Sequence, residues 1–158
     1  MDLDYFKRIN DTLGHYIGDQ LLSQFAGILK KIIRPTDFSC RFGGDEFFII
    51  MPPSGVIESL NVAKRIQSSL RNADFTSYAI ESKRISVSIG LAIYEPFQKM
   101  SVESFFKKAD GNLLAAKKSG KNQIFNDLDT NIKNTAVSNL ERKALSLQFQ
   151  ETTFMGEQ

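Results

Sequence analysis

The chain has 158 residues, of which 42% are hydrophobic and thirteen are phenylalanine, so it can bury one sizeable core and is expected to form one main domain. Its formal net charge of +2 is too small and too mixed to indicate a nucleic-acid partner. No apolar run approaches the length of a membrane-spanning helix, and the start is acidic rather than a basic signal region, so we expect a soluble, cytoplasmic chain. The single cysteine, Cys40, excludes a disulfide framework and a cysteine-rich zinc site, and its apolar surroundings predict a buried thiol.

The first residues alternate acidic and apolar side chains and then become helical. Asp2 and Asp4 stand at alternate positions, as at the end of a strand, and residues 5–13 predict a short helix that ends at Gly14. The first N–H groups of a helix have no partner within it, so they and the helix dipole would stabilise an anion placed there. Lys7 is close enough to add a positive charge, although a lysine at a helix start is ordinarily solvated.

Three polar side chains follow in the next turn and at the start of a second helix. Asn10, His15 and Asp19 carry an amide, an imidazole and a carboxylate, groups that suit the edge of a guanine base or a ribose. Each also has a structural explanation, because a lone histidine is more often structural and an aspartate suits a helix N-terminus. Apolar spacing predicts the second helix over residues 20–33, ending before Pro35.

A polar turn, Arg-Pro-Thr-Asp at residues 34–37, precedes an expected strand over residues 38–42. An arginine fork can bind a phosphate or the Hoogsteen edge of guanine, and an aspartate can accept hydrogen bonds from guanine N–H groups. The simpler interpretation is a helix-ending arginine and a turn initiated by aspartate. This four-residue spacing alone does not separate the two interpretations.

The stretch RFGGDEF at residues 41–47 predicts a β-hairpin with Gly43 and Gly44 as its turn, because consecutive positive φ angles favour glycine. Asp45 and Glu46 would then begin the second strand, where side-chain alternation sends them to opposite faces. One carboxylate could face a ligand while the other points away. Two solvated acids beside a Gly-Gly turn would give the same sequence.

The second half of the chain predicts two helices and further strands. Residues 54–72 carry one apolar face at helical spacing, and a second amphipathic helix begins at Ser101. Residues 83–94 alternate and are rich in β-branched side chains, which predicts a strand with residues 76–80 as its partner. A last short strand is expected over residues 122–125.

The composition becomes more polar after Asn126, so we place a domain boundary there. Residues 1–126 would form the folded domain, and residues 127–158 a polar linker or an amphipathic helical tail. A stripe of apolar residues at helical spacing within residues 129–150 favours a helix. A frayed tail, a dimerisation helix and a linker to a further domain all fit this pattern.

The hairpin and the acidic start, with a Gly-His and a Gly-Asp pair between them, resemble the GGDEF family of diguanylate cyclases over residues 2–125. The resemblance implies an α/β (α+β sandwich) fold in which helices flank a central, mostly antiparallel sheet with the βαββαβ core of nucleotidyl cyclases. It implies that two GTP are joined into cyclic di-GMP with release of two pyrophosphates. Since each subunit would hold one GTP, it also implies a homodimer for catalysis.

The same resemblance implies a metal site. Asp2, Asp45 and the backbone carbonyl of Leu3 would bind Mg²⁺ or Mn²⁺, which would polarise the α-phosphate and lower the pKa of the attacking 3′-hydroxyl. Asp45 is the expected proton acceptor and Glu46 the supporting acid. Lys7 would stabilise charge on the transferring phosphates.

The resemblance further implies contacts with the nucleotide, in which Asn10 and Asp19 bind the base and two lysines bind the terminal phosphates. Position 121 carries lysine where the family usually has arginine, so the bidentate fork is lost and weaker triphosphate affinity is expected. Two solvated lysines near a helix C-terminus are the simpler alternative. The expected substrate-binding residues are Phe6, Asn10, His15, Asp19, Lys117 and Lys121.

The polar turn at residues 34–37 stands at the offset from the hairpin where many family members bind their own product. By resemblance, Arg34 and Asp37 would form a product-inhibition site for cyclic di-GMP. Arg65, on the following helix, resembles a secondary arginine that helps to hold product from a second copy.

The sequence departs from the family at its front, because Met1 immediately precedes the metal-binding acid where members usually have about one helix and most of a strand. If Met1 is the true start, the central strand would be short, with unpaired ladder groups, and activity could be lost. A catalytically silent GTP or cyclic di-GMP sensor, and a fragment of a bifunctional protein with an EAL-type phosphodiesterase domain, are therefore alternatives.

Overall fold

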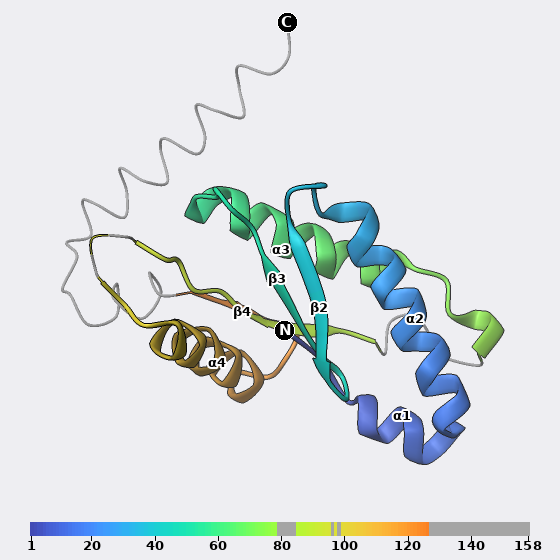
Figure 1. The fold of residues 1–158 in the computed structure, drawn as a ribbon. Coiled ribbons are helices and arrows are strands. Elements are labelled where there is room, and N and C mark those ends of the chain that lie inside the picture. Colours follow the sequence, from blue (N-terminus) through green and yellow to red (C-terminus); the bar gives the residue numbers. More distant parts are fainter. Residues whose placement is uncertain (79–84, 96, 98, 127–158) are drawn as a thin grey trace, which may run out of the picture. The chain divides into compact units, whose positions relative to one another are not determined.

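The computed structural model describes residues 1–78, 85–95, 97 and 99–126, which contain a five-stranded sheet with helices packed against it (Figure 1). The strand order is β2-β3-β1-β4-β5, and every neighbouring pair is antiparallel except the parallel pair β4–β5. This arrangement confirms the expected α/β fold with a mostly antiparallel sheet and a βαββαβ order. The elements are β1 (Asp2–Leu3), α1 (Phe6–Leu13), α2 (His15–Ile32), β2 (Phe38–Gly43), β3 (Glu46–Ile50), α3 (Val56–Asn72), β4 (Val87–Gly90), α4 (Val102–Lys118) and β5 (Ile124–Phe125).

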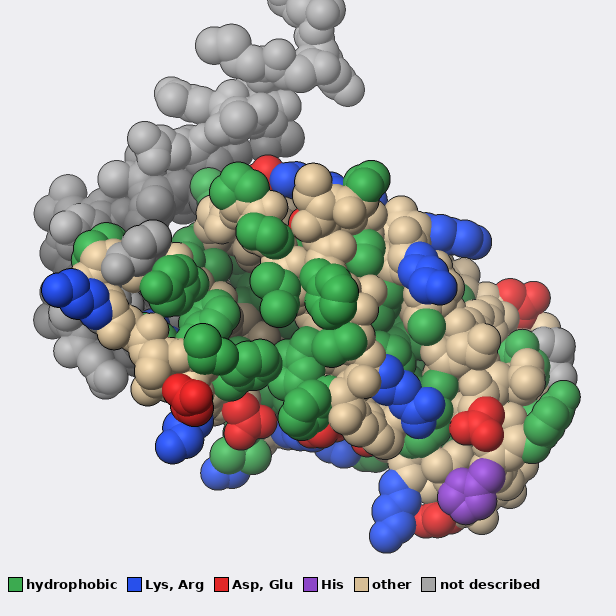
Figure 2. All heavy atoms as spheres, viewed as in Figure 1, with side chains coloured by type: hydrophobic (Ala, Val, Ile, Leu, Met, Phe, Trp, Pro, Cys, Tyr) green, Lys and Arg blue, Asp and Glu red, His purple; other side chains and the backbone are tan. Residues whose placement is uncertain are grey.

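The central strand, β1, is only two residues long. It places Asp2 opposite Glu46 of β3 on one side and Ser88 of β4 on the other. A largely apolar cavity of about 510 Å³ lies beside it, lined by residues of β3, β4, α3 and α4. Figure 2 shows hydrophobic side chains gathered on this face of the molecule.

The main core lies where α2 and α3 pack against the sheet. Phe25 of α2 and Phe47 of β3 are buried, and their rings meet edge to face with centroids 5.0 Å apart, a geometry that aromatic quadrupoles favour. The apolar spacing correctly predicted this helix, but α2 begins at His15, several residues before the predicted start. Gly14, with φ of 86°, ends α1 and leads directly into α2, and the polar first turns carry no apolar stripe that could have revealed them.

The predicted strand at residues 76–80 is wrong where the structure describes it, because Thr76–Tyr78 form a 3₁₀ helix. Asp74 Oδ1 accepts hydrogen bonds from the backbone N–H and the hydroxyl of Thr76, at 2.9 and 2.7 Å, and this local turn competes with an extended backbone. Residues 79–84 lie outside the described residues. The strand β4 pairs instead with β1 and β5.

The structure confirms the predicted start of α4 and corrects the predicted burial of Cys40. Ser101 caps α4 as predicted, since its hydroxyl accepts a hydrogen bond from the backbone N–H of Ser104. Cys40 is exposed rather than buried, because β2 lies at the edge of the sheet that the described residues form. None of the described helices is long and apolar enough to cross a membrane. The helix predicted within residues 129–150 lies outside the described residues.

Candidate active site

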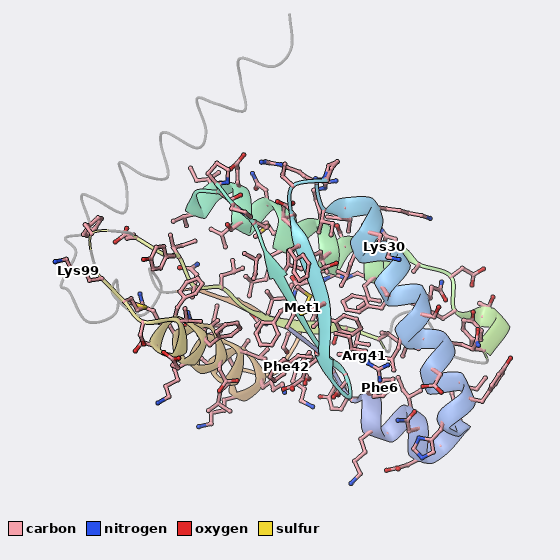
Figure 3. All side chains as sticks on the ribbon, viewed as in Figure 1. Met1, Phe6, Lys30, Arg41, Phe42 and Lys99 are labelled. Atoms are coloured by element: carbon pink, nitrogen blue, oxygen red, sulfur yellow. The ribbon has the colours of Figure 1, made fainter. Side chains whose placement is uncertain are left out.

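The glycine hairpin joins β2 to β3, as the sequence predicts, but its turn is one residue further along. Gly44 has a positive φ of 28°, whereas Gly43 is the last residue of β2 and pairs with Glu46 after a shift in register between Arg41 and Gly43. Asp45 consequently stands in the turn, and Glu46 is the first residue of β3. The Nε of Arg41 donates a hydrogen bond of 2.9 Å to the carbonyl of Gly44 and holds the turn (Figure 3). No sequence motif indicated this role for Arg41.

The two acidic segments meet at the centre of the sheet. The backbone N–H of Leu3 donates to the carbonyl of Asp45 at 3.2 Å, and Asp2 lies opposite Glu46 in the ladder. Burial raises the pKa of Asp2 above its ordinary value; the hydrogen bond from Lys117 opposes this rise, and the negative charges of Asp45 and Glu46 add to it. The structure therefore gathers three carboxylates within electrostatic reach of one another.

Lys117 neutralises part of this acidic cluster. Its Nζ lies 2.8 Å from Asp2 Oδ2, and the two side chains are 32% and 11% exposed. Burial alone would lower the pKa of Lys117, but its hydrogen bond to Asp2 and the charges of the acidic cluster raise it overall. The lysine reaches the site because α4 approaches β4 closely at Gly90, where a Cβ atom would collide with the backbone of Leu113.

The second lysine of this region, Lys121, lies over an aromatic ring at the start of α1. Its Nζ is 3.8 Å from the centroid of the Tyr5 ring, within the range of a cation–π contact. Tyr5 adopts the left-handed conformation with φ of 61° just before α1. Lys7 is exposed in the first turn of the helix that follows.

Asp4 has a structural role that the sequence analysis did not assign. It is 1% exposed, and its carboxylate accepts hydrogen bonds from Ser86 Oγ at 2.6 Å, Ser88 Oγ at 2.7 Å and the backbone N–H of Asn122 at 2.9 Å. These bonds tie the end of β1 to β4 and to the turn that precedes β5. The small serines at alternate positions were the sequence signal that could have indicated it.

The predicted base-binding residues lie at the junction of α1 and α2. Asn10 Oδ1 is buried without a hydrogen-bond partner among the described residues. It lies against Gly18, where an added Cβ would collide with the Asn10 side chain. The buried ring of Phe6 lies beside the same glycine. Asp19 lines a groove of about 570 Å³ between α2 and β2. His15 is exposed at the first residue of α2, so it is the most loosely placed of the set.

The predicted product site lies on the turn between α2 and β2. Asp37 Oδ2 accepts a hydrogen bond of 2.8 Å from the backbone N–H of Arg34, which fixes the turn. The guanidinium of Arg34 is directed to α3, where its Nη2 lies 2.6 Å from Glu58 Oε1. Arg65 is exposed further along α3. Glu58 was not singled out from the sequence.

The acidic cluster suits a hard divalent cation, since Mg²⁺ and Mn²⁺ prefer carboxylate and carbonyl oxygens. Among the described residues there is no group of three or more His, Cys, Asp or Glu side chains placed to hold a metal ion. The expected ligand set is smaller than that, with the carboxylates of Asp2 and Asp45 and the carbonyl of Leu3. The excess of negative charge around Asp2, balanced by one lysine, is consistent with this set.

The chain folds into a mixed five-stranded sheet with helices packed against it, and a glycine hairpin brings acidic residues to the central strand. These features define an α/β domain of the nucleotidyl-cyclase type. The family model described as "Diguanylate cyclase, GGDEF domain" matches residues 1–123. The chain therefore belongs to the GGDEF family, as the sequence motifs indicated.

Individual relatives agree with this assignment. The chain is 38% identical over 125 residues to the response regulator PleD of Caulobacter vibrioides, covering 78% of this chain and 27% of that protein. It is 34% identical to diguanylate cyclase A of Treponema denticola, covering 78% of this chain and 33% of that protein. The chain thus spans about a third or less of these curated relatives. The crystal structure of the GGDEF domain of DgcB from Caulobacter crescentus in complex with c-di-GMP superimposes with a TM-score of 0.71 and 31% identity, covering 79% of this chain and 73% of that one.

Proposed function

We propose that this chain is the catalytic domain of a diguanylate cyclase, which condenses two GTP into cyclic di-GMP and releases two pyrophosphates. Membership of the family supports this proposal. The observation that carries it is the meeting of Asp2 with the hairpin acids, through the Leu3–Asp45 backbone bond and the Asp2–Glu46 register. An isolated hairpin motif would not require this convergence.

In the proposed reaction, the 3′-oxygen of one GTP attacks the α-phosphorus of the other, and the bond from that phosphorus to the pyrophosphate oxygen breaks. Asp45 accepts the 3′-hydroxyl proton, and Glu46 keeps the surroundings negative. A Mg²⁺ or Mn²⁺ ion held by Asp2, Asp45 and the Leu3 carbonyl would supply a Lewis acid at the α-phosphate. A second, identical step closes the ring.

Basic groups on two sides of the site would hold the phosphates. Lys117 and Lys121 would bind the terminal phosphates, which carry the negative charge that leaves as pyrophosphate. Lys7 and the free N–H groups at the start of α1 would stabilise the remaining charge. Lys117 already lies beside Asp2 and Lys121 beside Tyr5, so phosphate binding by these two lysines would exchange one contact for another.

The base would be bound near the junction of α1 and α2. The amide of Asn10 and the exposed carboxylate of Asp19 are groups that can hydrogen-bond to the edge of a guanine base. His15 would contribute at the rim, and Phe6 would support Asn10. Because each domain would bind one GTP, two copies must face each other, so we propose a homodimer as the active form.

We also propose that Arg34, Asp37 and Arg65 form a product site for cyclic di-GMP. The hydrogen bond from the Arg34 N–H to Asp37 fixes the turn between α2 and β2, and both Arg34 and Arg65 have exposed side chains. A phosphate and a guanine edge are the groups that such a set recognises.

Incubation with GTP and Mg²⁺ or Mn²⁺, followed by chromatography of the nucleotides, tests the activity. We expect the native chain to form cyclic di-GMP and Asp45→Ala to form none. Glu103→Gln, which removes an exposed charge at the start of α4, should keep full activity. Equal turnover in all three proteins would contradict the proposed role of the hairpin acid.

A GTP or cyclic di-GMP sensor without turnover is the second candidate, and the ion pair between Lys117 Nζ and Asp2 Oδ2, at 2.8 Å, favours it. The pair occupies a carboxylate oxygen that a metal ion would need. The native chain would then bind cyclic di-GMP in calorimetry without consuming GTP. Turnover that disappears with Asp45→Ala rules this candidate out.

A further inference from the structure

The ion pair between Arg34 and Glu58 joins the turn after α2 to the first turn of α3. Arg34 Nη2 and Glu58 Oε1 are 2.6 Å apart, and the side chains are 50% and 48% exposed. Among the described residues, the Arg34 guanidinium forms its ion pair with Glu58. Asp37 is bound instead to the backbone N–H of the same arginine. The side chain expected to bind product is therefore already paired inside the chain.

The geometry points to Glu58 as an internal competitor that occupies Arg34 and weakens product binding. This inference rests on the proposed product site and adds its regulation. A guanidinium binds a phosphate or a guanine edge best through two parallel N–H bonds. A carboxylate on Nη2 takes one of those donors and cancels the charge that attracts an anionic dinucleotide.

The position of Glu58 on α3 strengthens this inference. Glu58 and Arg65 stand seven residues apart on one helix, so they lie about two turns apart on the same exposed side. The first turn of a helix also favours a negative charge, and the hydrogen bond and charge of Arg34 lower the pKa of Glu58. The competitor thus stays ionised at neutral pH.

The Asp37 carboxylate does not bind the Arg34 guanidinium. Its Oδ2 is bound to the backbone of Arg34, while its Oδ1 is buried with no hydrogen-bond partner among the described residues. Asp37 is thus bound to the backbone of Arg34, and the guanidinium of that arginine is left to Glu58.

Calorimetric titration of cyclic di-GMP into four proteins tests the inference: native, Arg34→Ala, Glu58→Gln and Glu103→Gln. We expect Arg34→Ala to weaken binding by roughly tenfold or more, as for loss of a charged fork. Glu58→Gln should tighten it by about two- to five-fold, the span that an exposed ion pair can account for. Glu103→Gln, which removes the same charge from α4, should leave affinity unchanged.

The outcomes separate the inference from the product site on which it rests. Binding that Arg34→Ala weakens but Glu58→Gln leaves unchanged or weakens overturns the competitor and keeps the product site. Binding that Arg34→Ala does not alter overturns both. Equal tightening by Glu58→Gln and Glu103→Gln assigns the effect to net charge and also overturns the competitor.

A second measurement establishes that the pair forms in solution. Urea unfolding of Arg34→Ala, Glu58→Gln and the double variant, without ligand, should show non-additive midpoints, because each single change already breaks the pair. Additive midpoints would overturn the inference. Both residues are exposed, so all three variants are expected to fold.

Discussion

Two ion pairs of nearly equal length, Lys117–Asp2 and Arg34–Glu58, differ in their surroundings. The N–O distances are 2.8 and 2.6 Å, but the first pair is 32% and 11% exposed and the second 50% and 48%. An exposed pair typically contributes little to stability, because water screens its charges, whereas removing one partner of a buried pair costs about 3–5 kcal/mol. The shorter pair is thus the weaker one, and its weakness is what would let a ligand displace it.

The largest effect is expected at Asp4, the most buried carboxylate of the catalytic side. Asp4→Ala removes the acceptor of three hydrogen bonds and leaves Ser86 Oγ, Ser88 Oγ and the Asn122 N–H without it. We expect the free energy of unfolding to fall by about 3 kcal/mol, measured by urea denaturation. Ser86→Ala removes one of the donors and should cost only about 1 kcal/mol. Similar costs for the two variants would contradict the central role of Asp4.

A smaller loss is expected for Lys117→Met, which breaks the buried member of the comparison. The partly exposed lysine reduces the expected cost to about 1–2 kcal/mol at neutral pH, again measured by urea denaturation. Lys118→Met, at an exposed neighbouring position, is the matched control and should change stability little. Equal stability of the two variants would show that the exposed fraction of the side chains does not predict how much an ion pair contributes to the free energy of unfolding.

The same variant has a pH dependence with a definite sign. The pKa of Asp2 is raised in the folded protein, so the folded state binds its proton more readily and gains stability as the pH falls from above that raised pKa towards the ordinary value of 3.8. Without Lys117 the pKa of Asp2 rises further and the gain begins at higher pH. The stability difference between the native chain and Lys117→Met should therefore shrink on acidification, and a difference that grows would contradict this account.

The sequence predicted those parts of the fold that are determined by residues close together along the chain. The stripe of apolar residues around Phe25 located most of α2, and the glycine pair located the hairpin. The turn was placed one residue too early, because either glycine could have taken the positive φ that Gly44 adopts. The Asp4–Ser88 and Arg34–Glu58 contacts join residues 84 and 24 positions apart, and no local pattern encodes such pairings.

A third, smaller effect concerns Lys121, whose partner is an aromatic ring instead of a carboxylate. Lys121→Arg restores a bidentate fork and should tighten binding of a non-hydrolysable GTP analogue by about threefold, because an arginine also keeps its stacking on Tyr5. Lys118→Arg, on the exposed part of α4, should leave the affinity unchanged. Calorimetry measures both, and equal affinities would show that residue 121 does not contact the nucleotide.

The smallest effect is expected at Cys40, on the exposed edge strand β2. Because its thiol is exposed, Cys40→Ser should change the free energy of unfolding by less than about 0.5 kcal/mol, as surface substitutions usually do.

The native chain should also react fully with a thiol reagent in the absence of denaturant. Cys40 lines the groove that Asp19 shares, so a bound GTP analogue should slow the labelling if the base occupies that groove. Labelling at the same rate with and without the analogue would place the base outside it, while a thiol that reacts only in denaturant would contradict the exposed edge itself.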